Sequence, residues 1–115
     1  MTDRRPEKVH RSQLTEDERR IRSLIARLVT NYGLIRGTLN VREKVCGRPN
    51  CRCARGERHR SVALVASENG KLRQLHIPKT LEETAEQWVE TYRRIRELLE
   101  ELSQLQWDKL KRREP

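Results

Sequence analysis

The chain has 115 residues, and 26 Lys and Arg against 17 Asp and Glu give it a formal net charge of +9. This length allows one small domain with a modest core, because 37% of the residues are charged and Phe is absent. No apolar stretch reaches the roughly 20 residues of a membrane-spanning helix, and residues 1–13 contain no signal-like apolar segment. We therefore expect a cytoplasmic protein with no membrane partner.

The positive charge is concentrated in the first half of the chain. Residues 1–60 contain sixteen Lys or Arg against seven Asp or Glu, whereas residues 61–115 contain ten of each. A surplus confined to one segment is typical of a surface that binds an anionic partner, nucleic acid above all.

The N-terminal segment predicts a disordered basic arm over residues 1–13, which have no apolar periodicity, followed by a helix. Thr15 and Glu18 form a capping-box pattern, and Gly33 is a typical residue after a helix end. Between them, apolar residues recur at helical spacing: Ile21, Leu24, Ile25, Leu28, Val29 and Tyr32. The arginines on the opposite face fit a solvated face as well as a binding face.

The middle of the chain predicts a small antiparallel sheet. Alternating apolar residues at positions 39, 41 and 45 indicate a strand, and Asn69-Gly70 is the strongest short hairpin signal, between strands 61–67 and 71–77. With these two residues as the turn, the opposing pairs are Ala66 with Arg73, Leu64 with Leu75, and Val62 with Ile77. The apolar residues then share one face, which must be covered.

A long amphipathic, coiled-coil-like helix is predicted from the capping-box pattern of Thr80 and Glu83 to about Lys111. It would be about 45 Å long, whereas the first helix could cover only about 25 Å of it. Its apolar residues are spaced alternately by four and three, which indicates an association arm. The centre of this arm is Trp88, Tyr92, Ile95, Leu99 and Leu102. The alternative is a helix that packs across its own hairpin and first helix.

All three cysteines, Cys46, Cys51 and Cys53, fall within eight residues, and His59 follows. Thiolates and a neutral imidazole are favoured zinc ligands, so we predict a structural Zn²⁺ knuckle held by these four residues. Reduced free cysteines and an iron–sulfur role are the alternatives, and His76 is the alternative fourth ligand.

Cations surround the predicted zinc site. They are Arg42, Lys44, Arg48, Arg52, Arg55, Arg58 and Arg60, against only two acidic residues in that segment. Three thiolates on one Zn²⁺ leave a charge near −1, so one or two cations neutralise the site, and we predict that the others bind nucleic acid phosphates.

The string from Cys46 to His59, then a hairpin, Ile77-Pro78-Lys79 and a long Leu/Glu/Arg helix, resembles a widespread family of small prokaryotic proteins of unknown function. The resemblance spans residues 34–105. It implies the same four metal ligands and the hairpin-then-helix order, and it implies no established activity. Where many relatives have Gly-Pro-Tyr and aromatic strand residues, this chain has Arg60 to Leu64, which argues against base stacking.

These observations predict an α+β protein: a disordered arm over residues 1–13, a helix with a zinc-knuckle β lobe over 14–78, and an association helix over 79–112. The predicted function is a non-enzymatic, zinc-stabilised nucleic-acid-binding module. Duplex DNA is favoured over RNA because aromatic platforms are scarce. Its protein partner would be a second copy or a larger DNA-processing protein. The alternative function is a protein–protein adaptor or oligomerisation module.

Overall fold

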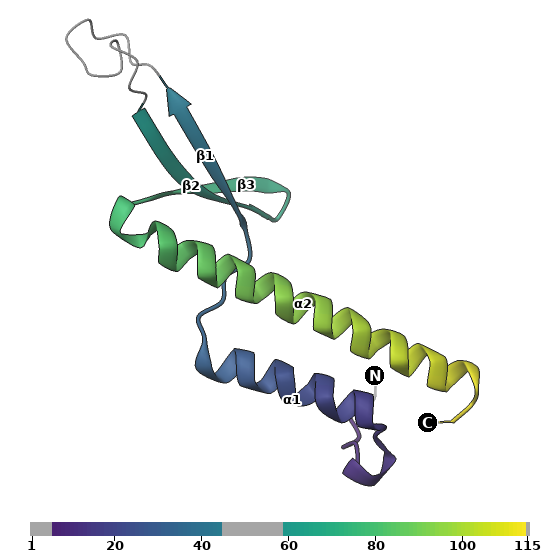
Figure 1. The fold of residues 1–115 in the computed structure, drawn as a ribbon. Coiled ribbons are helices and arrows are strands. Elements are labelled where there is room, and N and C mark those ends of the chain that lie inside the picture. Colours follow the sequence, from purple (N-terminus) through teal and green to yellow (C-terminus); the bar gives the residue numbers. More distant parts are fainter. Residues whose placement is uncertain (1–5, 45–58, 115) are drawn as a thin grey trace, which may run out of the picture. The chain divides into compact units, whose positions relative to one another are not determined.

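The computed structural model describes residues 6–44 and 59–114. The helices are α1 (Glu16–Asn31) and α2 (Glu82–Lys111), and the strands are β1 (Thr38–Lys44), β2 (His59–Glu68) and β3 (Lys71–Ile77) (Figure 1). Two 3₁₀ turns, Arg11–Gln13 and Lys79–Leu81, precede the helices. The predicted α+β class, with a short helix, an antiparallel sheet and a long helix, is therefore confirmed.

The described residues form two compact units, and the division falls within α2. The helical unit contains α1 and the part of α2 from Ile95 onward. The sheet unit, Tyr32–Arg94, contains the three strands and the first part of α2. Each unit has its own buried residues.

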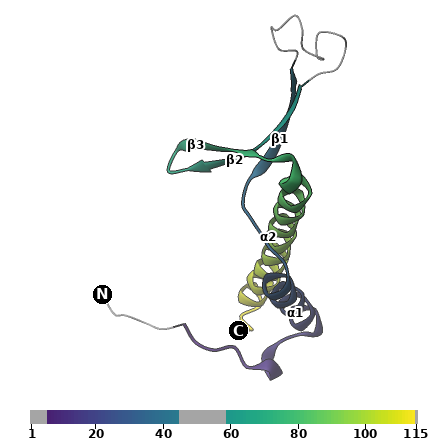
Figure 2. The same cartoon turned by 90° about the vertical axis from the view of Figure 1, so that its left-hand side faces the viewer.

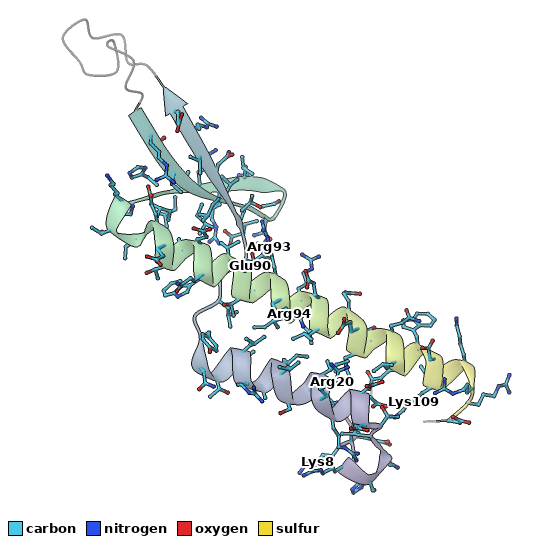
Figure 3. All side chains as sticks on the ribbon, in the orientation of Figure 1. Lys8, Arg20, Glu90, Arg93, Arg94 and Lys109 are labelled. Atoms are coloured by element: carbon cyan, nitrogen blue, oxygen red, sulfur yellow. The ribbon has the colours of Figure 1, made fainter. Side chains whose placement is uncertain are left out.

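In the helical unit, the predicted capping box is present at the start of α1. The Glu18 N–H donates to Thr15 Oγ1 at 3.2 Å, and the Thr15 hydroxyl donates to Glu18 Oε1 at 3.3 Å. The Glu18 side chain is 1% exposed and pairs with Lys109 of α2, with Nζ 2.6 Å from Oε1. Lys109 also donates to the Gln13 carbonyl oxygen at 3.0 Å, and Figure 3 shows its place near the end of α2. The start of α1 is therefore bound to the end of α2.

The end of α1 differs from the prediction. The helix stops at Asn31, and Gly33 does not have the positive φ of a helix-terminating glycine. Instead, a Cβ at position 33 would lie 2.2 Å from Nε1 of Trp88. Two residues on, the Ile35 N–H donates to the Trp88 carbonyl oxygen at 3.1 Å. Glycine is required here by the close approach of the indole ring and not by backbone conformation.

In the sheet unit, the strand order is β1-β2-β3, and both pairings are antiparallel. The predicted register is confirmed: Val62 opposes Ile77, and Leu64 opposes Leu75. Asn69 and Gly70 have φ of 51° and 77°, as a two-residue turn with left-handed central residues requires. The turn thus fixes which apolar side chains share a face.

One face of the sheet is covered by the first part of α2. The core consists of Val62, Leu64 and Ile77 from the strands with Ala85 and Val89 from the helix, and Ile35 and Leu39 pack against it. Leu75 belongs to the same face by register but is 61% exposed, whereas Ile77 of the same strand is buried. The opposite face of the sheet is open to solvent.

The predicted capping box of the second helix is replaced by a different start. A 3₁₀ turn, Lys79–Leu81, has Pro78 as its N-cap without a side-chain hydrogen bond, and α2 continues from Glu82. The end of α2 at Lys111 agrees with the sequence prediction. Among the described residues, no helix has the length and apolar character to cross a membrane.

Candidate metal and nucleic-acid site

The β1–β2 ladder defines the base of the cysteine-containing segment. Its last pair is Lys44 opposite His59, next to Glu43 opposite Arg60. Cys46 follows Lys44 by two residues in the sequence, and the ladder brings the backbones of Lys44 and His59, on either side of residues 45–58, opposite each other. Antiparallel neighbours are about 5 Å apart, which is a suitable separation for a metal segment to close upon itself.

Most of the predicted ligands and cations lie outside the described residues. This holds for the thiols of Cys46, Cys51 and Cys53, for the side chains of Lys44 and His59, and for Arg48, Arg52, Arg55 and Arg58. Within the described residues, no group of three or more His, Cys, Asp or Glu side chains is arranged to hold a metal ion. The zinc site therefore stays a prediction from the sequence.

The register distinguishes between the two candidate histidine ligands. His59 is the first residue of β2, at the base of the cysteine segment, whereas His76 opposes Ala63 on β3. Four residues along a strand correspond to about 13 Å, so the backbone at His76 is far from the ladder end. Three thiols and one imidazole are a donor set that suits Zn²⁺, and His59 stays the predicted fourth ligand because its backbone, and not that of His76, ends the β1–β2 ladder.

Arg42 and Arg60, the predicted nucleic-acid contacts whose side chains are described, lie on opposite faces of the ribbon. Arg42 opposes Ser61, on the open face, whereas Arg60 opposes Glu43, on the face that α2 covers. The Arg60 guanidinium forms an ion pair with Glu82, in the first turn of α2, while half of its side chain stays exposed. Arg60 therefore connects the ribbon to the helix, a role that the charge count could not show.

A groove of 330 Å³ lies between the covered face of the ribbon and α2. Its apolar residues include Val41 and Val62, and Glu82, Glu86 and Glu90 line it from successive turns of the helix. Arg60 pairs with Glu82, and Arg93 lies 3.9 Å from Glu90 (Figure 3). The groove is thus acidic and partly neutralised, and it is unsuited to a polyanion.

The predicted association residues do not share one environment. Ile95 is buried, Tyr92 and Leu102 are half-buried, and Trp88 and Leu99 are 44% and 50% exposed. The buried stripe of α2 instead includes Val89 and Leu98. Further along, Trp107 and Leu110 are more exposed than any of these residues.

The fold and the ladder-based site define an α+β module built around one β ribbon and one long helix. The chain belongs to a family described as "Domain of unknown function (DUF6788)", which matches residues 11–87. The matched region contains the four predicted metal ligands and the seven predicted nucleic-acid contacts, while the five predicted association residues lie beyond it. No curated protein and no solved structure gave a significant match.

Proposed function

We propose that this protein is a zinc-stabilised, non-enzymatic module that binds duplex DNA, as an accessory to a larger DNA-processing protein or as a homodimer. The observation that carries the proposal is the Lys44–His59 end of the β1–β2 ladder, to which the segment with three cysteines and four arginines is attached. Arginines on a zinc-bound knuckle would contact phosphates with little further ordering on binding, and the sheet core fixes the other end of the ribbon.

Zinc has a physical role in this proposal. Among its described residues, the sheet unit has a core of five buried side chains, and a lobe of that size would gain much of its stability from a metal. Cys46, Cys51, Cys53 and His59 would hold the ion. When bound, it supplies structural cross-linking, because four protein ligands leave no open position for catalysis. A cytoplasmic location belongs to the same proposal, since thiols must stay reduced to bind zinc.

The charge distribution supports a polyanionic partner. The entire surplus lies in residues 1–60, and its densest part is the segment between β1 and β2. Cations that displace condensed counterions from DNA bind with a free energy that depends strongly on salt and weakly on sequence. DNA is favoured over RNA because aromatic residues for base stacking are few.

The test is the combined variant Arg52→Gln, Arg55→Gln and Arg58→Gln, measured with metal content retained. Duplex binding by the parent should fall steeply with salt, and the variant should bind more weakly with a smaller salt slope, by about one unit for each lost contact. Arg93→Gln, which removes a cation from α2, is the matched control. If the triple variant binds duplex DNA as the parent does, the proposed interface is wrong.

The second candidate function, a protein–protein adaptor or oligomerisation module, is supported by a separate observation. Leu99, Trp107 and Leu110 of α2 are each at least half exposed, although a large apolar side chain gains free energy from burial. A wild-type chain that associates at micromolar concentration and binds no duplex even at low salt would favour this function over the first.

A further inference from the structure

The open face of the sheet differs in charge from the covered face. By register, the described side chains of the open face are those of Thr38, Asn40, Arg42, Ser61, Ala63, Val65, Ser67, Leu72, Gln74 and His76. None of them is acidic. The acidic residues of the strands, Glu43 and Glu68, both fall on the other face, because Glu43 opposes Arg60 and Glu68 opposes Lys71. This separation suits a face that approaches a polyanion.

Several side chains of this face are of the types that hydrogen-bond to base edges, although Ala63, Val65 and Leu72 are apolar. Arg pairs with guanine, Asn and Gln pair with adenine, and Ser and Thr pair with either. Asn40, Arg42 and Ser61 are all exposed and lie together, since Arg42 is directly opposite Ser61 and two residues from Asn40. Two residues along a strand span about 6.8 Å, close to two base-pair steps of about 3.4 Å.

The shape of the strands fits the same ligand. The β2–β3 ladder ends at Val62 opposite Ile77, so from Ser61 toward the cysteine segment only β1 and β2 remain paired. Arg42 and Ser61 form the first pair of this two-stranded part, whereas Asn40 lies two residues earlier, where its partner Ala63 also opposes His76 of β3. Figure 2 shows that this two-stranded ribbon diverges from the β2–β3 hairpin. A two-stranded ribbon is narrow enough to enter the major groove of B-form DNA, which is about 12 Å wide.

We propose that the open face of the β1–β2 ribbon reads base edges in the major groove of duplex DNA through Asn40, Arg42 and Ser61. This inference rests on the proposed function and extends it, because the arginines of the neighbouring segment contact phosphates, which carry no sequence information. Arg42 then acts as a base-reading residue, and the module prefers particular sequences instead of binding all duplexes alike.

The experiment starts with selection of duplexes from a random library by the zinc-loaded full chain. We expect enrichment of a motif that contains guanine and adenine. The variant Arg42→Lys keeps the charge but loses the planar two-donor fork, so it should reduce the preference for the selected over a random duplex about tenfold. Its affinity for the random duplex and its salt slope should be unchanged. Asn40→Ala should reduce the preference similarly.

Arg73→Lys is the matched control, since Arg73 lies on the other face, exposed and paired with Glu68 at 3.0 Å. It should leave the preference as it is. Equal losses for Arg42→Lys and Arg73→Lys, or a parent that binds DNA but enriches no motif, would overturn base reading and leave the DNA-binding module intact. Equal competition by duplex RNA, whose deep major groove excludes side chains, would also overturn base reading, and it would remove the proposed preference for DNA over RNA. A parent that binds no duplex overturns both proposals.

Discussion

Replacement of Lys109 by Met should destabilise the protein strongly, because it leaves the buried Glu18 carboxylate without its cation. Glu18 is 1% exposed and Lys109 is 14% exposed, with 2.6 Å between Oε1 and Nζ. Removing one partner of a buried ion pair costs about 3–5 kcal/mol, and the partial exposure of Lys109 places this pair near the lower end, at about 3 kcal/mol. Glu18 Oε2 already has no hydrogen-bond partner among the described residues, so nothing there compensates.

The assay is urea denaturation followed by circular dichroism at 222 nm, which reports both helices. Arg20→Met is the matched control: it removes a cation from the Arg20–Asp17 pair, whose side chains are 65% and 67% exposed. Such surface pairs contribute between 0 and about 1 kcal/mol, so the control should lower the free energy of unfolding by less than that amount. Equal losses for the two variants would refute the reasoning from burial.

The same pair predicts a pH dependence. Burial by itself raises the pKa of Glu18, but hydrogen bonds from Lys109 and Thr15 and the charge of Lys109 outweigh it, so the pKa lies below its ordinary value of 4.5. The unfolded chain therefore binds a proton more readily than the folded chain. The stabilisation is fully present above pH 4.5 and is lost as the pH falls through the lowered pKa. Glu18→Gln should flatten this acid dependence, and Arg20→Met should retain it.

Three further predictions concern other parts of the chain. Gly33→Ala should lower the free energy of unfolding by about 1–3 kcal/mol, because the new methyl group displaces the indole ring of Trp88. The fluorescence of Trp88, measured in a Trp107→Phe background, should shift as well. An unchanged spectrum would contradict the close approach of Trp88 to Gly33. Chelation, or Cys51→Ser, should remove about one Zn²⁺ per chain and speed hydrogen exchange in residues 40–44 and 59–78 more than in α2; identical exchange with and without metal would count against a structural site. Leu99→Lys should convert any oligomer to a monomer in light scattering without unfolding the chain, since Leu99 is half exposed; a parent already monomeric at high micromolar concentration would leave α2 without an association role.

The strand register was predictable from the sequence because its determinants are local. The Asn69-Gly70 turn and the alternation of Val62, Leu64 and Ile77 together allow only one pairing of β2 with β3. The start of α1 was predictable for the same reason. The Thr15 side chain accepts a hydrogen bond from the N–H of Glu18, only three residues further along the chain.

The contacts between distant segments were not predictable from local patterns. The heptad spacing of α2 identifies an apolar stripe but not its orientation, and the structure buries Val89 and Leu98 while leaving Trp88 and Leu99 exposed. The pairing of Glu18 with Lys109 links the start of α1 to the end of α2. Nothing in the sequence around either residue distinguishes it from an ordinary charged residue on the surface. For Gly33, the correct residue was singled out for the wrong reason, because the approach of Trp88 is a tertiary contact.

A count of cations along the chain overstates the surface that they make available to a polyanion. Arg42 and Arg60 stand in the same basic segment, yet the alternation of a β-strand places them on different faces. Arg60 pairs with Glu82 beside an acidic groove, whereas Arg42 lies on a face whose described residues include no carboxylate. The ribbon thus has one face that attaches it to α2 and one that carries no carboxylate on the residues that the structure describes. If this module binds DNA, substitutions on the two faces should have different effects. Those on the covered face should lower the stability of the protein, and those on the open face should weaken the recognition of DNA.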